Sequence, residues 1–215
     1  MKKKISILLT MLTFSCQSKE KVQDLPHFKH NKPMEIQDKL EIATFAGGCF
    51  WCTEAVFLEL EGVKSVTSGY IGGTTVSPTY SDICRGDTGH AEAIQIIFDP
   101  KIISFGELLE VFFATHDPTT LNRQGNDVGT QYRSEIFYHI ASQKKIAEDY
   151  IALLTKENTF GKPILTVISE ASKFYEAEDY HQNYYNQNQS QGYCSYVITP
   201  KVEKVRKLFK DKLKK

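Results

Sequence analysis

The alternation of apolar and polar positions predicts a strand, a turn and a helix where the folded part of the chain begins. Between residues 40 and 46 every second residue is apolar or small, which is the period of a strand with one buried face. The positions on that face are Leu40, Ile42, Thr44 and Ala46. Gly47 and Gly48 then indicate a turn, and helical spacing follows from about residue 50 to residue 60 and ends at Gly62.

Three further strands and a capped helix are predicted in the next eighty or so positions of the pattern. Strands are expected over Val63–Ile71, Ala91–Phe98 and residues 134–140, and a glycine- and proline-rich loop is expected over residues 72–78. Ser104 and Glu107 form an S-x-x-E capping box in front of an apolar run, which indicates a helix that reaches about Thr115. The polar stretch 117–130 is not expected to enter the core.

The order of these elements is βαββαβ, which predicts an α+β fold of the ferredoxin-like type, a mixed sheet with helices packed on it. A helix capped by Ser142 is expected to follow, with Ile146, Tyr150, Leu153 and Leu154 on its inner face. A C-terminal extension then adds a strand over residues 164–169, a polar helix over 177–188, and a last helix that starts at Thr199 and buries Val202, Val205, Leu208 and Phe209. The Asn- and Gln-rich run 183–191 has no aliphatic residue to anchor it, and we expect it to be mobile.

The N-terminus has the pattern of a targeting segment. Lys2, Lys3 and Lys4 precede an apolar run over residues 5–14 that is too short to span a bilayer comfortably. Cys16 follows in a context that resembles a bacterial lipoprotein cleavage site. A buried N-terminal helix is the alternative, but the polar, Lys-rich stretch up to residue 38 offers it nothing to pack against.

This pattern divides the chain into a lipoprotein-type signal peptide (1–15), a polar tether (16–38) and one folded domain (39–215). Acylation of Cys16 would place the domain in the cell envelope, facing the periplasm or the outside, with the membrane contacted only through the lipid. A soluble periplasmic or secreted protein is the second possibility.

Composition excludes several classes of protein. In 215 residues, 41% are hydrophobic and 24% charged, which is close to the globular average and unlike a disordered or multi-span membrane chain. Lys and Arg (26) balance Asp and Glu (26), so the net charge offers no attraction to nucleic acid. Five cysteines are too few for a disulfide scaffold but enough to suggest thiol chemistry or a metal.

The sharpest chemical motif is the run Gly47-Gly48-Cys49-Phe50-Trp51-Cys52. A cysteine between a strand end and a helix start lies near unsatisfied N–H groups, whose positive potential favours the thiolate. Cys49 is therefore a candidate nucleophile. A buried structural cysteine, a thioredoxin-like redox pair with Cys52, and half of a zinc site are the alternatives.

Two of these alternatives fit the surrounding residues poorly. The remaining zinc ligands would be Cys84, Cys194, His90 or His116, and none of them forms a second closely spaced pair. Thioredoxin-like motifs have small residues or proline between the cysteines, whereas Phe50 and Trp51 are bulky and suit a methyl or thioether group. The motif therefore favours a sulfur-containing substrate and no bound metal.

A second group of candidates consists of acids and phenols. Glu92 lies at the start of a predicted strand, and in a dry pocket its carboxyl would stay protonated and could act as a general acid. Tyr80, Asp127 and Tyr132 could supply hydrogen bonds to a polar oxygen. The plain alternatives are a solvated glutamate and ordinary loop residues.

Five segments together resemble the type A peptide methionine sulfoxide reductases, in the family's order, over about residues 41–209. The segments are Gly47-Gly48-Cys49-Phe50-Trp51, Pro78-Thr79-Tyr80, Thr88-Gly89-His90-Ala91-Glu92-Ala93, Gly129-Thr130-Gln131-Tyr132-Arg133-Ser134 and Ala177-Glu178-Asp179-Tyr180-His181-Gln182.

The resemblance implies reduction of methionine S-sulfoxide, free or in proteins, to methionine. By matching motif, it implies that Cys49 is the nucleophile and Glu92 the proton donor. It further implies that Tyr80 and Tyr132 bind the sulfoxide oxygen, that Phe50 and Trp51 hold the methyl group, and that Asp127 belongs to the active site.

The chemistry of this reaction requires further thiols but no metal, flavin or nucleotide. Cys49 becomes a sulfenic acid, a second thiol condenses with it to a disulfide, and a thioredoxin-like dithiol reduces that disulfide. We expect a monomer with no nucleic-acid partner. A lipid-anchored module that binds thioethers or metals without turnover is the alternative from another class.

The second thiol has two candidates. Cys194 matches a tail cysteine of the family, and a mobile tail is brought to Cys49 at little entropic cost, so we favour it. Cys52 is the rival, because its separation from Cys49 is compatible with disulfide geometry.

Overall fold

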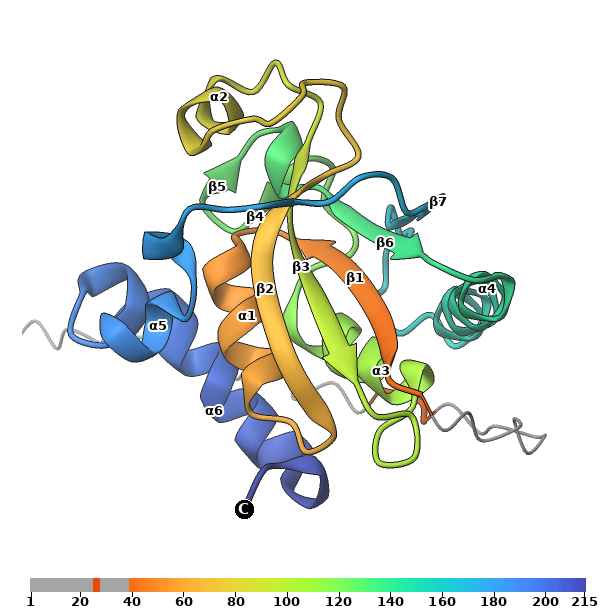
Figure 1. Ribbon diagram of the computed structural model, residues 1–215. Coiled ribbons are helices and arrows are strands. Elements are labelled where there is room, and N and C mark those ends of the chain that lie inside the picture. The colour runs from red at the N-terminus through yellow and green to blue at the C-terminus, as the bar shows by residue number, and fades with distance from the viewer. Residues whose placement is uncertain (1–24, 28–38) are drawn as a thin grey trace, which may run out of the picture.

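The computed structural model describes residues 25–27 and 39–215, and in it the predicted βαββαβ core is confirmed. Its strands alternate with its two main helices in the expected order (Figure 1). The elements are β1 (Glu41–Gly47), α1 (Phe50–Leu58), β2 (Val63–Ile71), β3 (Ala91–Phe98), α3 (Phe105–Thr115) and β6 (Ser134–Tyr138).

The sheet is mixed and has the strand order β7-β6-β1-β3-β2-β8. β3 lies antiparallel between β1 and β2, so α1 connects two parallel strands that are separated by one strand. This is the split βαβ connection of a ferredoxin-like fold. The extension adds β7 (Val167–Glu170), parallel to β6, and β8 (Tyr175–Glu176), antiparallel to β2.

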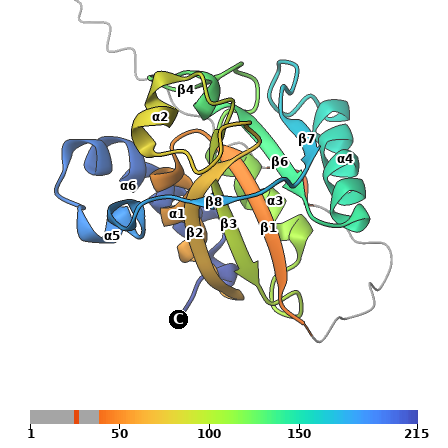
Figure 2. The ribbon, with the colours of Figure 1, turned by 45° about the horizontal axis from the view of Figure 1, so that its top comes forward.

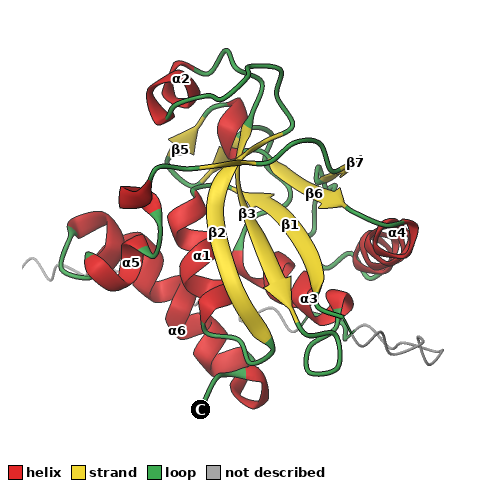
Figure 3. Ribbon diagram, in the orientation of Figure 1, coloured by secondary structure: helices red, strands yellow, loops and turns green. Residues whose placement is uncertain are grey.

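Helices cover one face of the sheet, and a chain segment crosses the other. α1, α3 and the C-terminal α6 (Thr199–Leu208) lie on the same side of the strands (Figure 3). Phe45 is the centre of the core there, with ring centroids 5.0–5.7 Å from three phenylalanines, Phe57, Phe105 and Phe112. On the opposite face the segment between β7 and β8 runs across the strands (Figure 2), where Phe174 packs on a smaller cluster that includes Ile71 and Phe137.

Both faces of β1 are buried from Ala43 onward, so the single buried face expected from the sequence is wrong. Thr44 and Ala46, on the expected face, are fully buried, and Ala46 belongs to the smaller cluster with Phe137. Ala43 and Phe45 are fully buried under the helices, whereas Leu40 is 53% and Ile42 is 38% exposed. Both faces of this strand carry apolar residues, so alternation alone did not distinguish them. The aromatic partners supplied by α1 and α3 place the Phe45 face in the larger core.

The polar helix expected over residues 177–188 is wrong. A short 3-10 helix (Asp179–His181) is followed by α5 (Tyr184–Gln187), and Asn183 between them has a left-handed backbone with φ +51°. The Gln182 side chain bonds both the N–H and the C=O of Ser68, which fixes a non-helical backbone at this point. The run expected to be mobile is held as well, because the buried Glu54 carboxylate accepts the N–H groups of Asn183 and Tyr184.

Three other boundaries differ from the sequence pattern. α4 (Ala141–Lys156) is capped at Ile140, so Ser142 lies inside the helix. The expected strand 164–169 is observed as β7, shifted toward the C-terminus. α2 (Tyr80–Arg85) was not predicted, although Thr79 and Asp82 form a capping box that signals its start.

The polar stretch 117–130 forms a small hairpin of β4 (Arg123–Gln124) and β5 (Asp127–Val128) beside the sheet. In the part of the chain that the structure describes, no helix has the length and apolar character needed to cross a membrane. The predicted signal peptide, Cys16 and most of the predicted tether lie outside the described residues.

Candidate active site

Two glycines place Cys49 at the junction of β1 and α1. Gly47 ends β1, Gly48 has φ +91°, and Cys49 is the N-cap residue of α1. A Cβ atom at Gly48 would lie 2.5 Å from the side chain of Gln124, whose amide is fixed by hydrogen bonds to the backbone of Asp117 at 2.9 and 2.6 Å. Both the backbone conformation and this close approach therefore require glycine at position 48.

Cys49 and Cys52 form a buried pair of thiols. Cys49 is 8% exposed and Cys52 is 1% exposed, and the Cys52 N–H donates to the Cys49 carbonyl at 3.1 Å. Burial raises the pKa of Cys49, and the adjacent Cys52 and Glu92 raise it further, so in the resting protein the helix start does not favour the Cys49 thiolate as the sequence suggested. The hydrogen bond from Cys49 instead lowers the pKa of Cys52 to about 7. Near neutral pH Cys49 therefore keeps its proton, and Cys52 is the thiol of the pair that ionises.

Glu92 is a buried carboxyl that faces the start of α1. It is 2% exposed, lies opposite Tyr70 in the β2–β3 pairing, and accepts the Phe50 N–H at 3.1 Å. Burial raises the pKa of Glu92 to about 8, and the charges of Asp127 and Cys52 act in the same direction. At neutral pH the carboxyl is protonated, which is the state that the sequence analysis expected for a general acid.

The candidate phenols and Asp127 surround the same point. Burial, followed by the charge of Glu92, raises the pKa of Tyr80 and of Tyr132, so both hydroxyls remain donors across the physiological range. The charges of Cys49 and Asp127 also raise the pKa of Tyr132, so the phenol lies near both groups. The Asp127 carboxylate accepts a hydrogen bond from Tyr193 Oη at 2.7 Å.

Phe50 and Trp51 occupy different positions. Phe50 is 1% exposed and packs under the site, with its ring centroid 5.9 Å from that of Tyr70. Trp51 is only half-buried and stacks on Tyr184, with centroids 3.8 Å apart and planes at 8°. The Trp51 indole N–H donates to Nδ1 of His181 at 3.1 Å, so the orientation of the indole is fixed.

Sequence reasoning assigned no role to His181, Glu178 and Tyr193, which complete the site. His181 contacts Trp51 and also the Tyr80 ring, at 4.4 Å between centroids. Glu178 accepts the backbone N–H of Tyr80 at 2.8 Å and so fixes the start of α2. The signal was present, because His181 and Glu178 belong to the segment 177–182 noted above and Tyr193 adjoins Cys194.

Cys194 is not part of a mobile tail. It begins a π-helical turn (Cys194–Ile198), its side chain is fully buried, and burial raises its pKa. Tyr193 precedes it and brings its hydroxyl to 3.8 Å from Cys52 Sγ. The Cys194–Ile198 turn and α6 therefore pack against α1, which carries Cys52. The fifth cysteine, Cys16, lies outside the described residues.

The histidines considered as zinc ligands make structural contacts. His90 binds the N–H of Gly73 and the C=O of Thr75, and His116 binds the Phe112 carbonyl and the Ser134 hydroxyl. Among residues 25–27 and 39–215 no group of three or more His, Cys, Asp or Glu side chains could hold a metal ion.

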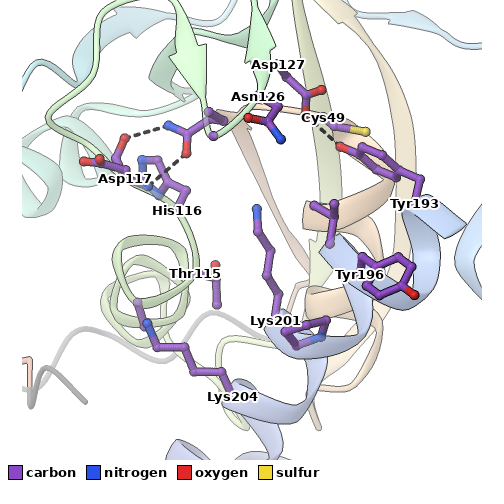
Figure 4. Close-up of a pocket in the computed structure, with 15 residues that line it drawn as sticks. Cys49, Thr115, His116, Asp117, Asn126, Asp127, Tyr193, Tyr196, Lys201 and Lys204 are labelled. Carbon is purple, nitrogen blue, oxygen red and sulfur yellow. Dashed lines mark hydrogen bonds between the residues drawn. The ribbon is translucent and has the colours of Figure 1, made fainter. Parts of the chain in front are cut away.

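A cavity of about 640 Å³ opens beside Cys49 on the side of α3 and α6 (Figure 4). Tyr193 and Asp127 form the part of its wall nearest Cys49, Lys201 of α6 extends into it, and Lys204 lies farther from Cys49. Cys49 therefore has Glu92 and the two phenols on one side and this cavity on the other.

Comparison with known proteins gives one consistent result. The family model for peptide methionine sulfoxide reductase matches residues 41–213. The peptide methionine sulfoxide reductase MsrA of Deinococcus radiodurans is 59% identical over 174 residues, which cover 81% of this chain and 84% of that protein. The MsrA of Saccharolobus solfataricus is 56% identical over 175 residues, covering 81% and 98%.

Two solved structures are similar along most of their length. Reduced Mxr1 from Saccharomyces cerevisiae has a TM-score of 0.65 and 36% identity, and the match covers 76% of this chain and 94% of that one. Methionine sulfoxide reductase A of Corynebacterium diphtheriae has a TM-score of 0.64 and 35% identity, with coverages of 74% and 80%.

The buried Glu92 carboxyl predicts a pH-dependent effect of Glu92→Gln on stability. The folded-state pKa is about 8 and the ordinary value is 4.5, so between these values the unfolded chain releases a proton that the folded protein retains. The stability of the unaltered protein therefore falls as pH rises through this window, by up to about 1.4 kcal/mol per pH unit. Glutamine has no such proton, so the variant should gain in relative stability up to pH of about 8 and then level off.

Urea unfolding at a series of pH values measures this difference. Glu61→Gln, at an exposed position, is the matched control. A stability difference for Glu92→Gln that stays constant with pH would show that the Glu92 carboxyl is ionised in the folded protein.

Proposed function

The chain belongs to the peptide methionine sulfoxide reductase family and is an oxidoreductase that reduces methionine sulfoxide, and on this basis we propose that Cys49 attacks the sulfoxide sulfur while Glu92 protonates the oxygen. The observation that carries the assignment is the protonated Glu92 carboxyl, buried in the same group of side chains as the Cys49 thiol. A sulfoxide oxygen is a poor leaving group until it receives a proton. A neutral acid at this position supplies that proton.

In the first step the Tyr80 and Tyr132 hydroxyls bind the sulfoxide oxygen and increase the electrophilicity of sulfur. Cys52, with its lowered pKa, is placed to take the proton of the Cys49 thiol, which becomes the attacking thiolate. The oxygen leaves methionine as a hydroxyl group on Cys49 Sγ. Methionine sulfur is thereby reduced and Cys49 is oxidised to a sulfenic acid.

The substrate methyl group is held by the aromatic side chains. The Trp51 face, kept in place by His181 and Tyr184, is the accessible apolar surface, and Phe50 supports it from below. Sulfur and methyl groups pack favourably on aromatic rings. The Trp51 surface on one side and the hydroxyl donors of Tyr80 and Tyr132 on the other would distinguish the two sulfoxide epimers. The expected substrate is the S epimer.

In the second step a thiol must condense with the sulfenic acid and release water. The sequence favoured Cys194 on the premise of a mobile tail, but Cys194 is fully buried in a helical turn. Cys52 hydrogen-bonds Cys49 and has the lowered pKa of an attacking thiolate, so we assign the first disulfide to Cys49 and Cys52. Cys194, behind Tyr193, is then the thiol that can exchange with Cys52.

The cycle closes when an external dithiol reduces the disulfide, and a thioredoxin-like protein is the reductant of this chemistry. No metal, flavin or nucleotide enters any step. We propose that the enzyme acts as a monomer. A module that binds thioethers without turnover would need neither a protonated acid nor a paired thiol at the site.

For the localisation of the protein, we propose that acylation of Cys16 anchors it in the cell envelope, with the domain outside the cytoplasm. The support is the pattern of Lys2 to Lys4, the apolar run and the cysteine that follows. A membrane-bound repair enzyme would act on oxidised methionines of envelope proteins.

The catalytic assignment predicts that Cys49→Ser forms no methionine and that Glu92→Gln reduces kcat by about 100-fold or more, because a general acid contributes at least this much. Methionine release from a sulfoxide peptide, first in a single turnover without reductant and then with a dithiol, measures both steps. Glu61→Gln is the control for Glu92→Gln. Normal turnover by a folded Cys49→Ser protein would contradict the assignment.

The cysteine assignment predicts that Cys194→Ser stops at a Cys49–Cys52 disulfide after one molar equivalent of sulfoxide, whereas the unaltered protein forms this disulfide first and can then exchange it for Cys52–Cys194. Cys52→Ser should accumulate the sulfenic acid, since its nearest thiol is missing. Peptide mass spectrometry after thiol blocking, with a sulfenic-acid trap, identifies each product. A Cys49–Cys194 bond formed directly in Cys52→Ser at the normal rate would instead support Cys194.

The anchor assignment predicts that Cys16→Ser retains full catalytic activity but moves from the membrane to the soluble or precursor fraction. Intact-protein mass spectrometry of the membrane-bound form should show cleavage before Cys16 and added acyl mass. Unchanged membrane association of Cys16→Ser would show that something other than acylation holds the protein there.

A further inference from the structure

We propose that the cavity between α3 and α6 is a carboxylate-binding subsite, in which Lys201 binds a carboxylate of the molecule that carries the methionine sulfoxide. The inference rests on the proposed function, because it concerns the same substrate. It adds a substrate-binding residue, Lys201, and a preferred class of substrate, those with a carboxylate, neither of which the reduction step itself requires. The carboxylate can be the α-carboxylate of free methionine sulfoxide or an acidic side chain beside the sulfoxide in a polypeptide.

The cavity borders the residue that carries the reacting thiol. Cys49 is part of its wall, together with the C-terminal end of α3, the β4–β5 hairpin and the first turns of α6. A substrate whose sulfur lies at Cys49 therefore has this space available for the groups attached to its alkyl chain. Tyr196, 85% exposed, lies at the rim and leaves the cavity open to solvent (Figure 4).

The lysines of its wall are available to bind an added anion. Within the part of the chain that the structure describes, no ion pair is formed by Lys201 or Lys204. The two carboxylates of the wall already have donors: Asp127 accepts from Tyr193 at 2.7 Å, and Asp117 accepts from the N–H and hydroxyl of Thr119 at 2.9 and 2.7 Å. The two carboxylates keep their negative charge, but Lys201 and Lys204 are the charged groups of the wall that remain able to bind an added anion.

His116, which also lines the cavity, adds no charge to it. His116 is 8% exposed, and both of its ring nitrogens are hydrogen-bonded inside the protein. Burial lowers the pKa of His116 to about 4, so the ring is neutral under physiological conditions. The charge available to a ligand therefore comes from the lysines.

Lys201 is better placed than Lys204. Figure 4 shows its side chain extending from α6 into the cavity, with the nitrogen directed toward the loop that carries Asn126 and Asp127. Lys201 is half-buried and Lys204 is exposed, and charge interactions are stronger where water is partly excluded. The charge of Lys201 also reaches Cys52, so the ammonium lies close to the reacting thiols.

The experiment compares substrates that differ in one carboxylate. Free methionine sulfoxide is compared with its N-acetyl amide, and a blocked peptide with Asp on both sides of the sulfoxide is compared with the Asn peptide. The variants are Lys201→Met, Lys201→Arg, which keeps the charge, and Lys207→Met, an exposed lysine of α6 outside the cavity.

We expect Lys201→Met to lower the preference in kcat/KM for a carboxylate-bearing substrate over its neutral partner by about tenfold, mainly through KM. Lys201→Arg should retain most of the preference and Lys207→Met all of it. The substrate pair that responds identifies the source of the carboxylate. Added salt should reduce the preference of the unaltered protein.

An equal loss on charged and neutral substrates would show that Lys201 acts on the cysteine pair and would overturn the subsite. An unchanged preference in Lys201→Met would overturn it as well. Failure of the proposed function is distinguishable from both, because the unaltered protein would then not reduce the neutral amide at all.

Discussion

The hydrogen bond from the Phe50 N–H to the buried Glu92 carboxyl joins the two halves of the site, and much of its chemistry depends on this contact. It satisfies an N–H group that the start of α1 would otherwise leave unpaired, and it brings β3 next to the turn that carries Cys49. The same burial that makes the contact possible raises the pKa of Glu92 to about 8. One packing arrangement thus places the Glu92 carboxyl, our proposed acid, near Cys49, our proposed nucleophile, and keeps the carboxyl protonated.

The C-terminal third of the chain completes this arrangement from outside the βαββαβ core. Glu54 on α1 accepts two backbone N–H groups of the segment after Gln182, and Glu178 accepts the N–H of Tyr80. Carboxylates that receive backbone donors in partly buried positions are fixed in orientation. The result is that His181 and Tyr184 hold the Trp51 indole while Tyr80 faces the same site.

Cys49 is bordered by two environments with different tasks. On one side a protonated acid, two phenols and an indole suit a neutral dipolar group with a methyl substituent. On the other side lies the cavity lined by Lys201 and Lys204, which form no ion pair with any residue that the structure describes and which we propose as the subsite for a substrate carboxylate. Cys52, directly beneath in the first turn of α1, is reached by the potential of Lys201 and by the hydrogen bond from Cys49, so substrate binding and thiol chemistry share one electrostatic setting.

The sequence by itself determined the order of strands and helices, the cap of α3 at Ser104, the turn that presents Cys49, and a set of residues that the fold gathers around it. These features depend on local spacing and backbone conformation, which neighbouring residues dictate. The tertiary structure alone decided that both faces of β1 are buried, that the helix expected over residues 177–188 is interrupted at Asn183, and which thiol of the pair carries the lower pKa. It also decided that Cys194 is packed and that Lys201 faces the cavity. Burial and charge at a residue are set by groups far along the chain, and no local pattern contains them.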